Sequence, residues 1–187
     1  MTRLAGPIRQ LGFVVRDVDA AIKYWGEVMG VGPFLVFREM SFENYRYRGK
    51  PAISPVLTIG LAFSGPLQIE LIQQHDNSPS AYRDFLQDSH GEFQHVSPWF
   101  RDAASYDAAY KRLLASGLEI VHEGVVAGNV RCAYFAAAGR AGPQLEISEA
   151  LVAPHAQMWS ALQAAAGSWD GKTLIWDATT REVEHLD

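Results

Sequence analysis

Two similar stretches of the chain each hold a polar side chain that could do chemistry. The stretches Ile8–Asp17 and Phe93–Asp102 align without a gap at an offset of 85 residues, and both end in Arg-Asp. Gln10 and His95 coincide in this alignment. Each stretch alternates as a β-strand does, with successive side chains on opposite faces. The chain is therefore predicted to contain two copies of one structural unit, with polar groups at the same place.

A glutamate occupies a second pair of equivalent positions. Glu70 and Glu146 each lie between two aliphatic residues in a short predicted strand, and a Gly-Pro pair precedes each of these strands, at 65–66 and at 142–143. Because the aliphatic neighbours would face a core, alternation places both glutamates on the opposite face of their strands. The first and last strand of each unit are thus predicted to present a polar group on the same side.

These four side chains converge if each half curls its sheet around a shared cleft. One imidazole, two carboxylates and one amide oxygen suit a divalent metal ion of borderline to hard character, and they leave a position open for water or substrate. Taken singly, each residue is more simply a solvated strand residue. Taken together, Gln10, Glu70, His95 and Glu146 predict a metal site.

Hydrophobic periodicity predicts the elements that position these residues. In the first half, strand Ile8–Asp17 leads into a helix over Asp17–Met29 that is capped by Asp17. One long strand or a hairpin over Phe34–Tyr47 follows, and then strands Val56–Phe63 and Leu67–Gln73. A polar linker with a short helix at Pro79–Leu86 joins the halves.

The second half repeats this order, and a further segment follows it. The predicted elements are strand Phe93–Phe100, helix Ser105–Ser116, and strands Leu118–Glu123, Val130–Ala136 and Leu145–Ser148. Leu151–Asp187 has no counterpart in the first half and is predicted to form helix Pro154–Ala166 and strand Thr173–Trp176. The expected organisation is a first module at 1–74, a linker at 75–92, a second module at 93–150 and a C-terminal extension at 151–187.

Composition limits the class of protein. The chain of 187 residues is 48% hydrophobic and carries a net charge of −5, which argues against nucleic acid as the main partner. Cys132 is the single cysteine, so an internal disulfide and a cysteine metal site are excluded. The N-terminus lacks the apolar run of a secretion signal, and no stretch reaches the roughly 20 apolar residues of a membrane span. We expect a cytoplasmic protein without a membrane partner.

The paired units resemble the vicinal oxygen chelate superfamily, which includes glyoxalase I, methylmalonyl-CoA epimerase, extradiol dioxygenases and the bleomycin-resistance proteins. The resemblance covers roughly Ile8 to Ala150. It implies an α+β fold in which two tandem βαβββ modules form a shared curved-sheet cleft, followed here by a C-terminal helix-and-strand extension. It also implies a homodimer, because members commonly dimerise. The motifs that carry it are Gln10 to Asp17, Gln68-Ile69-Glu70, Gln94-His95-Val96 and Leu145-Glu146-Ile147.

By the same resemblance, the metal ligands carry over to Gln10, Glu70, His95 and Glu146, in an order similar to that of the zinc-using glyoxalase I. The implied ion is Zn, Ni, Co or Mn. Methylmalonyl-CoA epimerase normally has histidine where Gln10 stands, and a dioxygenase site needs a second histidine. The nearest activity is therefore that of an isomerase, epimerase or lyase of the glyoxalase I type.

The isomerase and epimerase members move a proton at a carbon next to a carbonyl group, through an enediolate that the metal stabilises. The resemblance implies Glu146 as the base, and Glu70 could act on the opposite side. Glu43 or Glu39 could supply an extra carboxylate, as in epimerases of the family. Both are more simply exposed strand residues.

The substrate is expected to be a bulky or greasy small molecule. Phe37, Tyr45, Tyr47 and Trp99 are predicted to line the cleft. Arg46, with Arg38 or Arg48, could hold the carboxylates of a glutathione adduct or the phosphates of a CoA ester, although this basic patch is more simply a solvated strand face. The alternative function is a metal-free protein of the bleomycin-resistance type, which would sequester a bulky aromatic compound.

Overall fold

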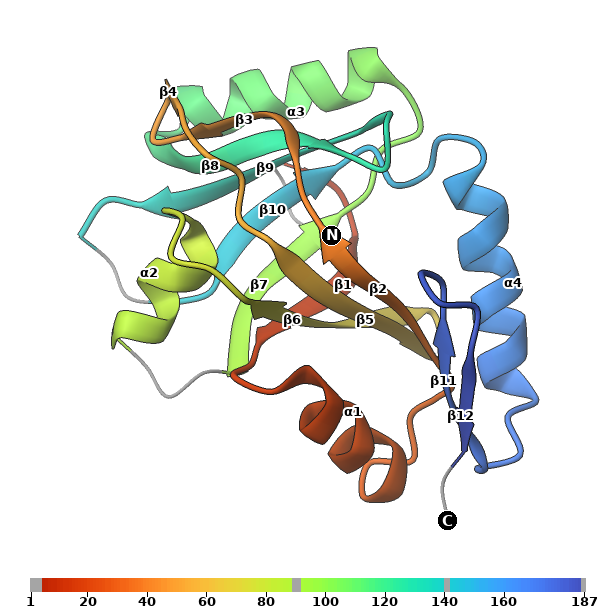
Figure 1. Ribbon diagram of the computed structural model, residues 1–187. Coiled ribbons are helices and arrows are strands. Elements are labelled where there is room, and N and C mark those ends of the chain that lie inside the picture. The colour runs from red at the N-terminus through yellow and green to blue at the C-terminus, as the bar shows by residue number, and fades with distance from the viewer. Residues whose placement is uncertain (1–4, 89–91, 140–141, 186–187) are drawn as a thin grey trace.

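Two halves with the same topology meet at the centre of one curved sheet (Figure 1). The computed structural model describes residues 5–88, 92–139 and 142–185. The first half consists of β1 (Ile8–Val14), α1 (Val18–Glu27), β2 (Phe34–Met40), β5 (Leu57–Ser64) and β6 (Leu67–Gln74). The second half consists of β7 (Glu92–Pro98), α3 (Ala103–Ala115), β8 (Leu118–Val126), β9 (Val130–Ala137) and β10 (Gln144–Ser148).

The pairing of the strands repeats between the halves. β1 pairs parallel with β6, and β7 pairs parallel with β10. β1 and β7 then pair antiparallel and join the halves, which gives the strand order β2-β5-β6-β1-β7-β10-β9-β8. The predicted α+β fold with two tandem βαβββ modules is confirmed.

Six further elements extend this frame. α2 (Ala81–Asp88) lies in the predicted linker, whose residues 89–91 are outside the described part. At the edges of the sheet lie β3 (Glu43–Tyr47), β4 (Lys50–Pro51), β11 (Thr173–Asp177) and β12 (Val183–His185). α4 (His155–Gly167) is the helix predicted in the C-terminal extension. In the described residues, no helix combines the length and the apolar character needed to span a membrane.

The prediction of one long strand or a hairpin over residues 34–47 is wrong. β2 pairs with β5 in the first half, whereas β3 pairs with β8 in the second half. Near the end of β2, Glu39 has a φ of 55°, which interrupts the extended backbone. Alternation continues through both strands and carries no information about the partner strand, so the sequence pattern could not separate them. The consequence is that Glu43, Tyr45 and Tyr47 lie on the edge of the second half.

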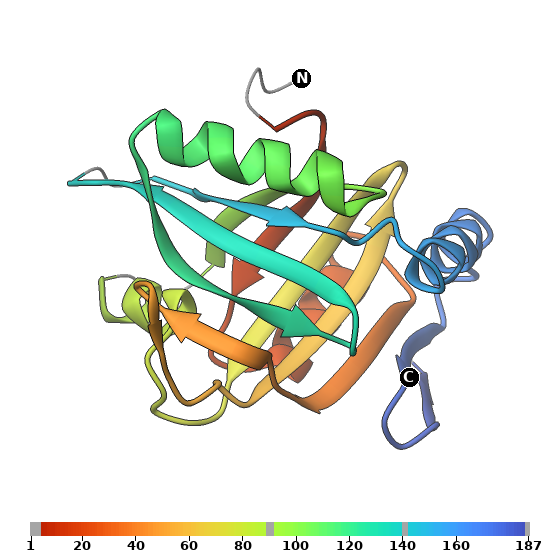
Figure 2. The same ribbon diagram turned by 90° about the horizontal axis from the view of Figure 1, so that it is seen from above.

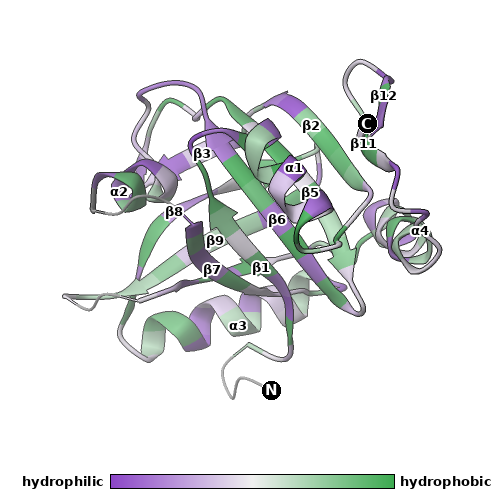
Figure 3. Ribbon diagram, turned by 90° about the horizontal axis from the view of Figure 1, so that it is seen from below, coloured by the Kyte–Doolittle hydropathy of each residue, from purple (hydrophilic) through white to green (hydrophobic). Residues whose placement is uncertain are grey.

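Helices α1 and α3 cover the outer face of the curved sheet (Figure 2). Ile22 of α1 packs in one hydrophobic cluster with Phe34 and Leu71, and Leu113 of α3 packs in another with Phe135. Figure 3 shows hydrophobic and hydrophilic residues occurring along the same strands, as expected when the two faces differ.

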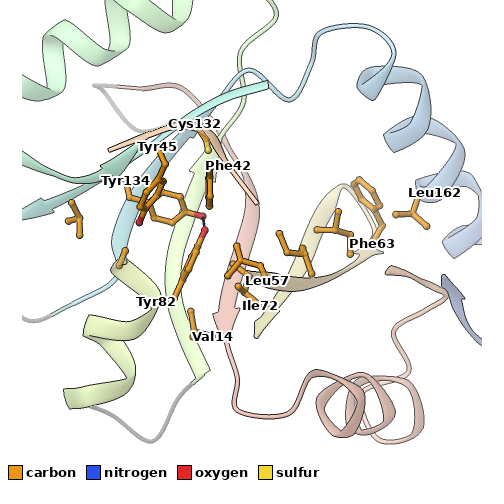
Figure 4. Packing of buried hydrophobic residues seen from close by; sticks show 14 residues of the cluster. Val14, Phe42, Tyr45, Leu57, Phe63, Ile72, Tyr82, Cys132, Tyr134 and Leu162 are labelled. Atoms are coloured by element: carbon orange, nitrogen blue, oxygen red, sulfur yellow. Dashed lines mark hydrogen bonds between the residues drawn. The ribbon is translucent and has the colours of Figure 1, made fainter. Parts of the chain in front are cut away.

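The inner face holds a third hydrophobic cluster (Figure 4). Val14, Leu57 and Ile72 come from strands of the first half, whereas Tyr134 comes from β9. The hydroxyl of Tyr82 on α2 donates a hydrogen bond to Tyr134 (3.0 Å), so the polar atoms of both buried rings are satisfied. This cluster joins the two halves from inside.

The repeated Arg-Asp pair has a structural role, because both aspartates cap a helix. Asp17 Oδ1 accepts from the Ala20 amide at 3.0 Å, and Asp102 Oδ1 accepts from the Ser105 amide at 2.8 Å. We expect Asp17→Ala and Asp102→Ala each to lower the free energy of unfolding, because each removes an N-cap. Urea denaturation would measure this, with Asp→Asn at each position as the control that retains the cap. Equal losses in the Ala and Asn variants would contradict the assignment.

Candidate metal centre

The four central strands bring the predicted ligands together. Gln10 lies on β1, Glu70 on β6, His95 on β7 and Glu146 on β10, and these strands are consecutive in the sheet. His95 Nε2 lies 3.1 Å from Glu70 Oε2 and 3.6 Å from Glu146 Oε2. All four residues are buried, and one ligand atom from each of the two glutamates and the histidine falls within a span of 4.8 Å.

Gly12 provides the space for the His95 ring. The two residues are directly opposite on β1 and β7. A Cβ atom on Gly12 would lie 1.8 Å from His95 Cε1, which is far inside van der Waals contact. The glycine in the Gln10-Leu11-Gly12 sequence is therefore required by the imidazole and not by backbone conformation.

Gln94 fixes the hydrogen position on the His95 ring. Gln94 Oε1 lies 2.7 Å from His95 Nδ1. Because a carbonyl oxygen can only accept, Nδ1 carries the hydrogen, and in the neutral ring Nε2 presents its lone pair toward the glutamates. Metal-bound histidines are oriented by such a bond on the other nitrogen.

The residues fit a metal ion. Gln10 Oε1, Glu70 Oε2 and His95 Nε2 are buried and form no hydrogen bond within the described part of the chain, which is rare for buried polar atoms. Gln10 Nε2 donates to Gln68 Oε1 (2.9 Å), and this bond leaves the carbonyl oxygen of Gln10 as the free atom. The separations of 3.1 and 3.6 Å between His95 Nε2 and the two glutamate oxygens are short enough for one ion to bind all three atoms.

The buried carboxylates are electrostatically unusual. Burial raises the pKa of Glu146 to about 7, His95 opposes this shift, and the negative charge of Glu70 adds to it. Ser97 and Tyr134 hydrogen-bond to the Glu146 side chain and lower its pKa. A carboxyl group that titrates near neutral pH is suited to accept and return a proton.

This raised pKa predicts a pH dependence of stability for the metal-free protein. Because the folded protein holds the Glu146 proton more tightly than the unfolded chain, the contribution to stability is complete below pH 4.5 and is lost as the pH rises through about 7. Urea unfolding in chelator between pH 4.5 and 8.5 should show the loss in the wild type and a smaller one in Glu146→Gln. Identical pH profiles of the two proteins would contradict the assigned shift.

A cavity of about 380 Å³ opens beside the cluster. Gln10, Glu70 and Glu146 form one part of its wall, and His95 lies completely buried behind them. Most of the remaining wall is apolar. The lining residues other than the three predicted ligands are Phe37, Met40, Ser41, Ile59, Leu61, Gln68, Trp99, Val126, Ala127, Val130, Ser148, Ala150, His155, Met158 and Trp159. Such a cavity can admit a small molecule to the predicted ligands.

Two of the predicted substrate contacts, Phe37 and Trp99, line this cavity, whereas the other four lie elsewhere. Glu43 is exposed on edge strand β3. The hydroxyl of Tyr45 donates to Pro79 O (2.8 Å) and that of Tyr47 bonds to Asp84, so both rings serve packing around α2. Arg46 lies 3.7 Å from Glu123 and lines a separate hollow. These four positions follow from the placement of β3 beside β8.

Several cavity residues have no counterpart among the predicted contacts. His155 and Met158 come from α4, and Gln68 holds Gln10 in place. Gln94, which is not part of the cavity wall, holds His95 in place. The spacing of His155, Trp159 and Leu162 on one side of the predicted helix could have indicated that His155 faces inward. Trp169 packs against Gly32, and Trp176 packs on the inner cluster, so neither lines the cavity.

Comparisons with known proteins agree with this architecture. A family model described as the Glyoxalase/Bleomycin resistance protein/Dioxygenase superfamily matches residues 9–149. Methylmalonyl-CoA epimerase from Mycobacterium tuberculosis is similar in structure, with a TM-score of 0.55 and 20% identity over 84% of this chain and 95% of that one. A hypothetical protein from Bacillus halodurans C-125 has a TM-score of 0.53 and 12% identity over 76% and 92%. No curated protein matches in sequence.

Proposed function

Because the chain belongs to the glyoxalase/bleomycin resistance protein/dioxygenase superfamily, as its motifs predicted, we propose that it is a metal-dependent isomerase or epimerase. It would move a proton at a carbon next to a carbonyl group. The observation that supports this most directly is the set of buried ligand atoms that have no hydrogen-bond partner among the described residues and lie beside a largely apolar cavity. A homodimer and a cytoplasmic location stay predictions.

Each polar residue has a part in this proposal. Gln10, Glu70, His95 and Glu146 would hold a divalent ion such as Zn, Ni, Co or Mn, which supplies a Lewis acid that lowers the energy of the enediolate. Glu146 accepts the proton from the substrate carbon, because its carboxylate lines the cavity and can both take up and return a proton. Glu70 lies on β6, on the other side of the β1–β7 pair from β10, and would serve the opposite face of the substrate. The apolar wall excludes water from the carbon that loses its proton.

The test is exchange of the α-hydrogen for deuterium. Protein loaded with Zn²⁺, Ni²⁺, Co²⁺ or Mn²⁺ is mixed in deuterated water with 2-hydroxy-1-phenylethanone, and the α-hydrogen signal is followed by NMR. We expect exchange above the uncatalysed rate, loss of the catalysed rate with chelator, and recovery on adding metal. Protein that takes up no metal but binds the aromatic ketone would contradict the proposal and favour the sequestration alternative.

A further inference from the structure

The cavity beside the metal centre carries no positive side chain. None of its lining residues in the described structure is lysine or arginine, while Glu70 and Glu146 give it two carboxyl groups. His155 is the one lining residue besides these that can ionise, and burial lowers its pKa and so favours the neutral ring. The two carboxylates would offset the charge of a divalent ion bound to them, so an anionic group elsewhere in the cavity would find no opposite charge among the described lining residues.

The nearby arginines are held in ion pairs outside the cavity. Arg38 Nε lies 2.7 Å from Asp177 Oδ2, and its other nitrogens bond to Asp19. Arg48 lies 3.1 Å from Asp84, and Arg46 pairs with Glu123. Arg38, Arg46 and Arg48 thus pair with acidic residues of β11, α1, α2 and β8, and none of the three lines the cavity.

Helix α4 bounds the cavity and limits its size. His155, Met158 and Trp159 contribute to the wall from this helix, which begins after the end of the family match at residue 149. Two contacts fix the helix: Trp159 Nε1 donates to Ala150 O (2.9 Å), and Leu162 packs in the inner cluster with Phe63 (Figure 4). The volume of about 380 Å³ is near the lower end of small-molecule sites, roughly 300 to 1,000 Å³.

We propose that the substrate is a compact, uncharged and largely apolar carbonyl compound, and that α4 is the element that selects it. This inference rests on the proposed function and names the substrate class of the same site. Compounds that would place a negative charge inside the cavity, away from the metal ligands, are expected to be poor substrates, because the described lining there is apolar and an unpaired buried charge is strongly unfavourable.

Two probes of equal shape test the role of charge. 4-(2-Hydroxyacetyl)benzamide is neutral, and 4-(2-hydroxyacetyl)benzoate carries one negative charge at the same place. With the metal-loaded full chain, we expect kcat/KM for α-hydrogen exchange to be about 100-fold lower or more for the benzoate. Binding of each probe is measured separately by quenching of tryptophan fluorescence, since Trp99 and Trp159 line the cavity.

A charge introduced on α4 should reduce this preference. Met158 lines the cavity and is partly exposed, so Met158→Lys can place an ammonium group at the wall. We expect it to raise kcat/KM for the benzoate by about 10-fold or more. Gln157→Lys adds the same charge at the next residue, which is exposed and outside the cavity, and is expected to change neither probe.

The outcomes separate this inference from the proposed function. Equal rates for the two probes, or faster exchange with methylmalonyl-CoA or with the glutathione adduct of methylglyoxal, would overturn the inference and leave the proposed function standing. Absence of exchange with every compound would count against the proposed function. In that case the fluorescence titrations still decide the inference, because it requires that the benzamide bind more tightly than the benzoate.

Discussion

Gly12→Ala is expected to remove the metal from the protein and to destabilise the fold. The new Cβ would lie 1.8 Å from Cε1 and 2.2 Å from Nε2 of the His95 ring, so the imidazole has to leave its place between the two glutamates. Both residues lie on central strands that pair with each other, and the backbone has little freedom to move apart. Overpacking of this kind costs about 1–3 kcal/mol or more. Mass spectrometry of bound metal and urea unfolding in chelator measure the two effects.

A second substitution separates the steric effect from a general loss of folding. In the Gly12→Ala/His95→Ala double variant the ring is absent, so stability should recover relative to Gly12→Ala while the metal stays lost. Gly167→Ala is the matched control, since a Cβ there meets no atom within 4 Å. A Gly12→Ala protein with wild-type metal content and stability would contradict the account of the site.

Glu146→Gln is expected to lower the rate of α-hydrogen exchange by about 10²- to 10⁴-fold. The amide keeps the shape of the side chain and the capacity to accept from Ser97 and Tyr134, but it cannot take up a proton. Exchange of 2-hydroxy-1-phenylethanone by the metal-loaded variant, corrected for its metal content, gives the measurement. Glu119→Gln makes the same change on an exposed strand position and should exchange at the wild-type rate.

Glu70→Gln provides the comparison between the two carboxylates. A larger rate loss in Glu70→Gln than in Glu146→Gln would assign the base to Glu70. Wild-type exchange in both variants would contradict the proposal that either carboxylate moves the proton.

The central strands of the site were predictable from the sequence because two signals agree: the internal repeat and the alternation of side chains along each strand. The alignment of Gln10 with His95 gave the equivalent positions, and alternation gave the face. Each strand of β6-β1-β7-β10 then had only one way to bury its aliphatic residues against the helices, so the ligands had to face the interior. The four predicted ligands could therefore be identified from the local sequence pattern, without knowledge of how the side chains pack.

The rest of the cavity depends on which elements lie side by side, and local pattern does not contain that information. Alternation over residues 34–47 is continuous, yet β2 pairs with β5 whereas β3 pairs with β8. Tyr45 and Tyr47 on β3 therefore lie away from the cavity. His155 and Met158 reach the site only because α4 packs beside β5. Gly12 shares a face with Gln10 in the sequence pattern, but its steric role appears only once β1 and β7 are paired.

The measurement that tests the metal centre most directly is the metal content of the purified protein, compared with that of His95→Ala and Glu146→Ala. The geometry predicts roughly one divalent ion per wild-type chain and its loss in both variants. The same ion should be taken up again when Zn²⁺, Ni²⁺, Co²⁺ or Mn²⁺ is added to metal-depleted wild type. A wild-type protein that is purified without metal and takes up none of these ions would contradict the four-ligand site and the enzyme function built on it.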